Sequence, residues 1–442
     1  MKQERLLELI DETHQQMMAL LGDLSDEQLD VPYERGINPP VWEVGHSAFF
    51  YEYFLLRPLR KVDPLMPGYD PVWDSFDIPH RERWSPGVVP GKAETLDYYD
   101  RAVAETIDLL SRGNTLTDEE SYLGQYVVAH QQMHLESLIW CRQTLGYQAP
   151  SFLVDEPVES NPDLGGDTAI PGGRYFIGVP VPAEEEKSIN FSFDNERPGF
   201  DQVLSDFQIS KTLVSRGEFA EFVDDGGYET AQWWSFGGNY WRRENKLTAP
   251  AYWAREGDTW TVRRFHEVRP LDPESPMLHV SFWEAEAYAK WAGRRLPTEF
   301  EWEVAARGPK AQKFPWGNDP DKAPPAALGS RNIGSAPVTG YMEGASPFGC
   351  LQMIGTAWEW TTSQYLPFAG FCVDMYAYMS TLQFGDHKTT RGGSAATSLS
   401  LPRNTYRQAI FPDRTDLFTG FRTCALQGNP RDQPASRTFP TS

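Results

Sequence analysis

Three of the eight histidines are spaced in a way that suits metal binding. His130 and His134 lie four residues apart in a helix-like stretch, which puts both imidazoles on one face, about 6 Å apart at Cβ. His46 lies in a separate helical stretch, and ligands in a helical bundle converge from facing helices. Three neutral imidazoles with open coordination positions suit a late first-row divalent ion such as iron, copper or zinc.

The same pattern has a simpler interpretation, in which the HxxxH pair is two partly exposed histidines on an amphipathic helix. Glu136 follows His134 by two residues and points to a different face, so this is not the HExxH arrangement of zinc proteases. Glu43 and Glu136 are either second partners of the ligand imidazoles or ordinary solvated glutamates. The residues alone leave both alternatives open.

Four helices would have to position these histidines. Apolar residues recur at helical spacing and predict helices over residues 6–22, 41–59, 92–110 and 118–145. The pair Pro39-Pro40 is a typical helix opening for the second of them. A loop rich in Pro and Gly, over residues 64–91, separates the second helix from the third. Residues 1–150 therefore predict a four-helix bundle with one long crossover.

The remainder of the chain has a different texture. Residues 151–168 are rich in Pro, Glu, Asp and Gly and predict a linker. From residue 169 onward short β-like runs alternate with turns. Helical periodicity returns only in three brief windows, over residues 215–225, 283–291 and 299–306. We therefore expect an irregular α+β domain over residues 169–428 and a flexible tail over 429–442.

Composition excludes several classes of protein. The 40 Lys+Arg against 62 Asp+Glu give a net charge of 40 − 62 = −22, which disfavours nucleic-acid and anionic-membrane partners. No apolar run is long enough to span a bilayer. We expect a cytoplasmic protein, because the four cysteines are far apart and form no CxxC pair; they are Cys141, Cys350, Cys372 and Cys424. We also expect a monomer or a small homo-oligomer.

The second half resembles a known family. The stretch HVSFWEAEAYAKWAGRRLPTEFEWE at residues 279–303 is similar to the core signature of the formylglycine-generating-enzyme domain. The resemblance covers most of residues 169–426 and implies an irregular fold of the C-type-lectin type, in which aromatic side chains supply much of the core. It extends to four shorter motifs: FPWGN at 314–318, WEWT at 358–361, RGGS at 391–394 and GFR at 420–422.

The first half resembles the DinB-like bundle that carries an HxxxHxE motif. The combination of both halves is similar to the sulfoxide synthases of ergothioneine biosynthesis. That resemblance implies a non-haem iron(II) held by His46, His130 and His134, with O2 as co-substrate and no other cofactor. It also implies the reaction, which joins cysteine or a similar small thiol to C2 of the imidazole of N,N,N-trimethylhistidine (hercynine) and gives a sulfoxide.

The sequence departs from this family at several positions. No cysteine lies shortly after the RGGS motif, over residues 395–404, so the copper–thiolate chemistry of true formylglycine-generating enzymes lacks its nucleophile. Met133 stands where many sulfoxide synthases have a glutamine that is hydrogen-bonded to the substrate, and Met is a much weaker acceptor. We nevertheless expect Met133 to contact the substrate.

A proton donor is also missing from its usual segment. Phe368 stands where many members have a tyrosine, and we expect Phe368 and Phe371 on the substrate side. Tyr98 and Tyr99 are the residues we predict to supply the phenol from the bundle. Their alternative interpretation is a pair of buried structural tyrosines.

The arginine pattern bears on the donor. Members that use γ-glutamylcysteine carry an arginine pair in the crossover loop, which is absent from residues 84–91. Arg81 and Arg83 lie upstream and either bind a donor carboxylate or solvate a loop. Arg407 and Gln408 are expected on the floor of the substrate pocket. The ending FRTC also resembles the selenoneine-synthase branch, which joins a selenosugar to hercynine, and both branches stay open.

Two further functional classes follow from the same features. Lectin-like folds often only bind ligands, so a non-catalytic binding module is one alternative. The change from Tyr to Phe at residue 368 motivates a thiol dioxygenase as the other, because loss of a proton donor would divert oxygen to sulfur.

Overall fold

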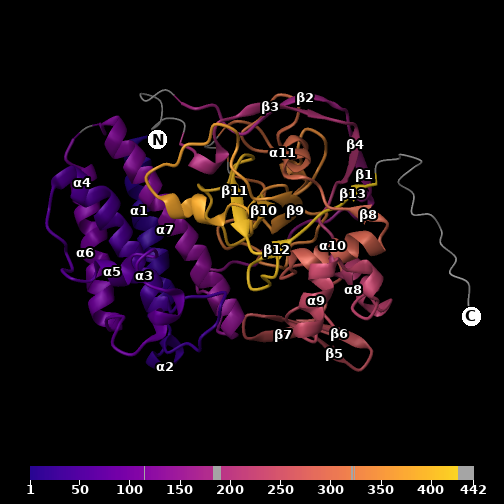
Figure 1. The fold of residues 1–442 in the computed structure, drawn as a ribbon, viewed down its shortest axis with the longest axis horizontal. Helices are drawn as coiled ribbons and strands as arrows, with labels where there is room; N and C mark the ends of the chain where they lie inside the picture. The colour runs from indigo at the N-terminus through magenta and orange to yellow at the C-terminus, as the bar shows by residue number, and fades with distance from the viewer. Residues whose placement is uncertain (114, 183–190, 320–321, 323, 427–442) are drawn as a thin grey trace, which may run out of the picture.

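The computed structural model describes residues 1–113, 115–182, 191–319, 322 and 324–426. The predicted tail at 429–442 lies outside them. The two halves of the chain fold differently and lie side by side (Figure 1). Residues 1–150 form helices, and the rest of the described chain combines short strands with short helices. The predicted α+β fold is confirmed.

Four long helical segments form the bundle, and three of them match the predicted bounds closely. They are α1 (Gln3–Gly22), α3 (Pro40–Tyr51), α6 (Lys92–Leu110) and α7 (Asp118–Leu145). The second segment continues from α3 through a π-helical turn, η1 (Glu52–Leu56), into α4 (Arg57–Arg60). Shorter helices occupy the connections: α2 (Asp26–Leu29), α5 (Asp70–Trp73) and the 3₁₀ turn η2 (His80–Trp84).

Local sequence explains where these helices begin and end. Pro40 is the first residue of α3, a position where its missing N–H costs no hydrogen bond. Thr117 and Glu120 form a reciprocal capping box at the start of α7, and Gly146 ends that helix at φ 69°. The α3 helix is buried on nearly every side because it packs against α6, α7 and α1. His46 therefore lies in the interior of the bundle.

The second half contains two four-stranded sheets, in the orders β1-β4-β13-β8 and β11-β10-β9-β12, with β12 parallel to β9. Strands β2-β3 and β5-β6-β7 form two smaller antiparallel units. The strands are β1 (Asp167–Ile170), β2 (Gly173–Ile177), β3 (Phe200–Leu204), β4 (Phe207–Ser210), β5 (Trp253–Glu256), β6 (Thr259–Arg264), β7 (Glu267–Pro270), β8 (Arg294–Arg295), β9 (Trp358–Gln364), β10 (Lys388–Arg391), β11 (Arg407–Ile410), β12 (Thr419–Gly420) and β13 (Cys424–Ala425).

The described part of this half contains four α-helices, and the sequence analysis predicted three of them. The three predicted windows correspond to α8 (Arg216–Asp224), α10 (Phe282–Trp291) and α11 (Glu299–Arg307), each opened by a capping box. The fourth, α9 (Phe236–Glu244), was not predicted. Within the described residues, no helix is both long and apolar enough to cross a membrane.

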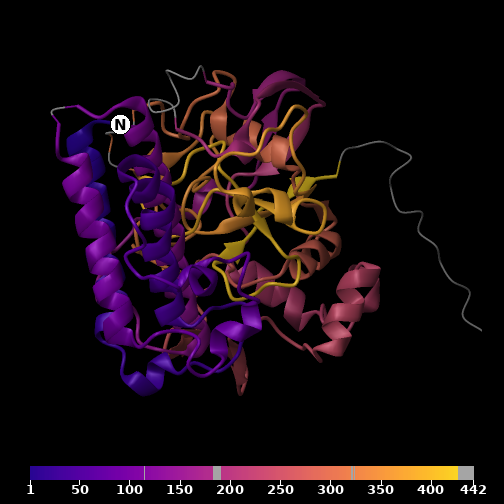
Figure 2. The same cartoon turned by 60° about the vertical axis from the view of Figure 1, so that its left-hand side comes forward.

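The seam between the halves follows α7. Figure 2 turns the molecule so that the bundle comes forward and the sheets of the second half lie behind it. Glu136 on α7 reaches across the seam and accepts hydrogen bonds from Trp358 Nε1 at 2.9 Å and Thr397 Oγ1 at 2.7 Å, and a short one from Ser394 Oγ. The helix that carries two of the candidate ligands is therefore part of both cores.

Candidate metal centre

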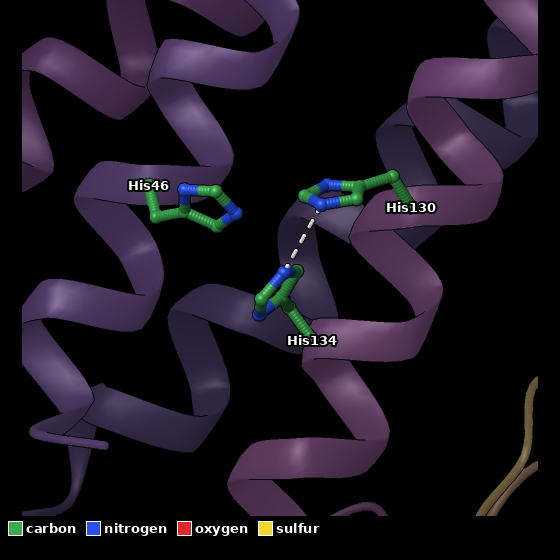
Figure 3. A group of neighbouring side chains, drawn as sticks. All are labelled: His46, His130 and His134. Carbon is green, nitrogen blue, oxygen red and sulfur yellow. Dashed lines mark hydrogen bonds between the residues drawn. The ribbon is translucent and has the colours of Figure 1, made fainter. Parts of the chain in front are cut away.

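The three histidines singled out by spacing converge in the bundle. Their candidate ligand nitrogens all lie within 4.8 Å of one another. His46 projects from α3 toward His130 and His134, which project from successive turns of α7 (Figure 3). The Nε2 atoms of His130 and His134 are 3.2 Å apart. Two facing helices thus supply three imidazoles to one point.

Two of the imidazoles are oriented through their other nitrogen. His46 Nδ1 lies 2.6 Å from the carbonyl oxygen of Trp73, which leaves Nε2 as the free lone pair when Nδ1 carries the proton. His134 Nδ1 is in short contact with the Glu43 carboxylate. Glu43 in turn accepts hydrogen bonds from Asn38 Nδ2 at 2.6 Å and Ser137 Oγ at 2.9 Å. Glu43 is therefore a second partner of a ligand imidazole.

The Trp73 carbonyl can reach His46 because residue 45 has no side chain. A Cβ on Gly45 would lie 2.3 Å from the Trp73 ring. The Trp73 side chain is fully buried, and its backbone belongs to the short helix α5 in the crossover loop. Gly45 thus lets α5 pack directly against α3, which brings the Trp73 carbonyl to the imidazole.

Burial keeps two of the candidate ligands neutral. It lowers the pKa of His46 to about 3, with a further contribution from His134, and it lowers the pKa of His130 well below its usual value. Burial alone would raise the pKa of Glu43, but contact with His134 and the hydrogen bonds from Asn38 and Ser137 together outweigh it and lower that pKa to about 2. At neutral pH His46 and His130 are therefore unprotonated, and the Glu43 carboxylate is charged and hydrogen-bonded.

The residues fit a metal ion. His130 is 3% exposed and stacks on Phe50 at 3.5 Å between ring centroids, and its Nδ1 has no hydrogen-bond partner among the described residues. A donor set of three imidazoles, with no thiolate or carboxylate in the group that converges among the described residues, suits a late first-row divalent ion with open positions.

A pocket of about 300 Å³ opens beside the three histidines and has walls from both halves of the chain. Its size suits a small-molecule substrate. The bundle contributes Asn38, Trp42, Glu43, His46, Ser75, Arg83, His130, Met133, His134, Ser137 and Trp140. The second half contributes Tyr376, Met379, Gln383, His387, Gln408, Ala409, Ile410, Phe411, Arg414 and Leu417.

Three of the residues predicted to contact substrate line this pocket. They are Arg83, Met133 and Gln408. The Arg83 guanidinium stacks over Trp42 at 3.7 Å and donates from Nη1 to Asn38 Oδ1 at 2.6 Å. Arg81, two residues earlier, stacks on Tyr33 instead and does not line the pocket. The alternation follows from η2, a tight turn that sends neighbouring arginines in different directions.

Arg407 and the two phenylalanines lie behind the pocket wall. Arg407 is 1% exposed, pairs with Glu299 and donates to the carbonyls of Asn195 and Leu366. Phe368 packs under its guanidinium at 4.2 Å, and Phe371 packs on Phe384 at 5.2 Å. Arg407 therefore faces the core, whereas the next residue on β11, Gln408, lines the pocket.

The two predicted catalytic tyrosines are not in the pocket either. Tyr98 donates its hydroxyl to Glu52 at 2.6 Å, beside the π-helical turn. Tyr99 is fully buried and packs against His14 at 5.0 Å. Both lie on the side of α6 that packs into the bundle core.

Tyr376 supplies the phenol side chain of the pocket, and the sequence analysis missed it. Its ring is edge-on to His130 with centroids 5.5 Å apart, and it packs edge-on to Phe50 at 5.0 Å. It comes from the loop between β9 and β10, the same loop as Phe368. Its place in that loop, eight residues after Phe368, is the one sequence signal that points to it.

Comparisons with known proteins agree with this architecture. Residues 9–138 match the DinB superfamily, and residues 155–426 match the Sulfatase-modifying factor enzyme 1-like domain. The chain is 35% identical over 419 residues to a hercynine oxygenase of Mycolicibacterium smegmatis, covering 91% of this chain and 94% of that protein.

Two further relatives match this chain over different lengths. A hercynine oxygenase of Mycobacterium tuberculosis is 34% identical over 414 residues, with 91% and 94% of the two chains covered. A formylglycine-generating enzyme of Thermomonospora curvata is 32% identical over 317 residues, covering 62% of this chain and 99% of that protein. The chain therefore belongs to the hercynine oxygenase family, the sulfoxide synthases of ergothioneine biosynthesis that join a DinB-like bundle to a formylglycine-generating-enzyme-like domain, and it is an oxygenase.

Proposed function

We propose that this oxygenase joins the sulfur of a small thiol to C2 of the hercynine imidazole, using iron(II) held by His46, His130 and His134. The observation that carries the proposal is the convergence of three imidazoles on the wall of a pocket of substrate size. The overall change balances as thiol plus hercynine plus O2 giving the imidazolyl sulfoxide plus water. A C–H and an S–H bond break, a C–S bond forms, and O2 takes up four electrons.

Iron(II), when bound, supplies the redox chemistry with O2 and open coordination positions that bring the donor sulfur and the acceptor imidazole together. The protein keeps the imidazoles oriented, through Glu43 on His134 and the Trp73 carbonyl on His46. The Tyr376 phenol lies on the pocket wall next to His130 and is positioned to hold or transfer a proton during the reaction.

The lining also suits the acceptor. Hercynine carries a fixed trimethylammonium charge, which favours the faces of aromatic rings. Trp42, Trp140, Tyr376 and Phe411 all line the pocket. The acceptor carboxylate needs a cationic or amide partner, and Arg83 lies on the bundle wall for that purpose.

A second candidate function is the joining of a selenosugar to the same carbon, with a selenol in place of the thiol in the balance above. The observation that favours it is that the pocket wall offers little cationic charge to a donor. Arg414 pairs with Asp416 and donates to the Gly36 carbonyl, and Arg83 is assigned above to the acceptor carboxylate. A donor rich in hydroxyls suits neutral side chains such as Gln408 better than a dipeptide with two carboxylates does.

The test is a donor panel with the full chain, iron(II), hercynine and O2. Cysteine, γ-glutamylcysteine and a selenosugar are each supplied alone, and products are identified by mass. We expect a C–S or C–Se adduct of hercynine with one donor, and none without O2. Oxidised donor without attached imidazole would instead indicate a thiol dioxygenase, and hercynine binding with no O2 consumption from any donor would indicate a binding module.

A further inference from the structure

A second, smaller cleft lies at the seam between the two halves, away from the three histidines. Its cavity volume is about 10 Å³, which holds one water molecule or one monatomic ion. Its walls come from the end of α7, from β6 and from the segments 278–279 and 333–334. The side chains that matter are Gln143, Arg216, Arg263, Arg264 and His279.

Arg216 is the unusual member of this cleft. It is the first residue of α8 and only 7% exposed. Among the described residues, none accepts a hydrogen bond from its guanidinium or lies at ion-pair distance from it. Gly334 preserves the space in front of it, because a Cβ there would lie 3.1 Å from Arg216 Nη2. Burial lowers the pKa of Arg216 to about 10, which still leaves the group charged at neutral pH.

The neighbouring groups do not neutralise this charge. Arg263 donates only to carbonyl oxygens, at 2.7 Å to Gln143 and Phe265 and 3.2 Å to Thr144. Arg264 is matched by a bidentate pair with Asp155.

The remaining titratable groups do not change that balance. Asp272 attracts Arg216 from a distance, but its carboxylate accepts hydrogen bonds from Ser275 Oγ and the Glu274 N–H. Burial and the nearby Arg216 lower the pKa of His279 to about 3, so this imidazole adds no charge. Arg216 and Arg263, neither of which is paired with a carboxylate within the described part of the chain, therefore share one small cleft.

We propose that this cleft is a binding site for a small inorganic anion, with chloride as the ion of matching size, held by the Arg216 guanidinium. A bound water would accept hydrogen bonds from Arg216 but would leave its buried charge uncompensated, which is costly. The cavity volume of about 10 Å³ favours a monatomic ion over the larger phosphate and sulfate. The site is independent of the proposed reaction, because none of these residues lines the larger pocket.

The anion would strengthen the seam. Gln143 on α7 exchanges hydrogen bonds with β6 and the residue after it, donating to the Arg263 carbonyl and accepting from the Phe265 N–H. Arg263 covers the last carbonyls of α7 from the other side. Neutralising this cleft stabilises the contact between the second half and the helix that carries His130 and His134. Anion binding is therefore expected to raise the stability of the folded chain.

The direct test is to crystallise the full chain in bromide and to measure anomalous scattering. We expect a bromide peak next to Arg216 that chloride competes away. An ordered water at that point, with no anomalous signal, would overturn the proposal. This measurement needs no variant, so it does not depend on how a substitution affects folding.

The solution test compares melting temperatures in chloride and gluconate at equal ionic strength, which cancels the general screening of the net charge of −22. Chloride should raise Tm by about 1–3 °C over gluconate in the unaltered chain. R216M should lose this difference, whereas R174M, which alters an arginine that is 69% exposed at its side chain, should keep it. Equal Tm in both salts, or an undiminished difference in R216M, would contradict an anion site at Arg216.

Discussion

The two walls of the candidate pocket are built on different principles. The bundle wall consists of long helices, and its ligands are fixed by local spacing: His130 and His134 are one turn apart on α7, and His46 faces them from α3. The opposite wall comes from β11 and from a loop between β9 and β10. It is held by buried ion pairs between distant residues: Arg407–Glu299, Arg391–Glu303, Arg403–Glu196 and Arg422–Glu359.

This difference in construction gives the two walls of the pocket different roles. The bundle wall presents the three candidate ligands in a rigid register, so changes there should affect the proposed metal binding and chemistry. The wall of the second half shapes the pocket through its supporting core, so changes in the ion pairs should affect stability before they affect chemistry. Variants on each wall can test this division, and the expected effects decrease from the ligands to the seam.

The largest effect is expected at a ligand. His134→Ala removes one of three imidazoles, and we expect loss of bound iron and a decrease in turnover of more than about 10³-fold. Iron content after desalting and product formation measure the two effects. His266→Ala is the matched control, because this histidine is 47% exposed and does not line the pocket. Full iron content in His134→Ala would exclude the three-histidine site.

The next effect concerns the other wall. Arg407→Met leaves the buried Glu299 carboxylate with the more distant Arg391, whose Nη1 is 4.0 Å away, as its cationic neighbour, and we expect the free energy of unfolding to fall by about 3–5 kcal/mol. The double variant Arg407→Met/Glu299→Met should recover most of that loss in urea denaturation. If Arg407 bound substrate instead, the single variant would raise KM while leaving the free energy of unfolding unchanged.

One tyrosine from each half provides a sharper comparison, Tyr376 on the pocket wall and Tyr98 in the bundle core. Tyr376→Phe should lower kcat by about 10²-fold without loss of iron, because it removes the hydroxyl on the pocket wall. Tyr98→Phe removes the bond to Glu52 and should lower stability by about 1 kcal/mol with kcat within about twofold of the unaltered chain. The reverse outcome, with kcat lost only in Tyr98→Phe, would assign the catalytic role to Tyr98 in the bundle.

The smallest effect is expected where the walls meet. Glu136→Ala leaves the Trp358 indole and the Ser394 and Thr397 hydroxyls without their acceptor, at a cost of about 2 kcal/mol. Glu136→Gln keeps an acceptor and should recover part of this loss, as thermal unfolding would reveal. A solvated glutamate, which was one sequence interpretation, predicts no change in either variant.

The regular parts of the fold could be predicted because their signals are local. The periodicity predicted the bounds of α6 and α7, and the Pro39-Pro40 pair indicated the start of α3. The helix α9 was not predicted because Gly237 and Gly238 weaken its pattern. Those glycines are explained by tertiary packing, since a Cβ on either would lie 3.2 Å from Trp283.

The candidate site likewise has one part that local sequence predicted and another part that it did not. Helical spacing and the family resemblance singled out the three histidines, because residues on one helix face meet by geometry alone. Tyr376 and His387 come from irregular segments, whose side-chain directions depend on contacts more than a hundred residues away, such as Asp374 with Arg197 and Asp194 with Ser380. No periodicity records such contacts, so the sequence analysis assigned the phenol to Tyr98 and Tyr99.

The Glu136 contact also limits how the chain can be recombined. In this protein the loop that begins with the RGGS motif presents hydroxyl groups to a carboxylate from the other half, with Ser394 and Thr397 as donors. A chimera that paired this bundle with a related second half lacking those hydroxyls would bury an acid with too few donors. The two halves are therefore exchangeable only as a matched pair, and any transplant of the bundle has to carry this loop with it.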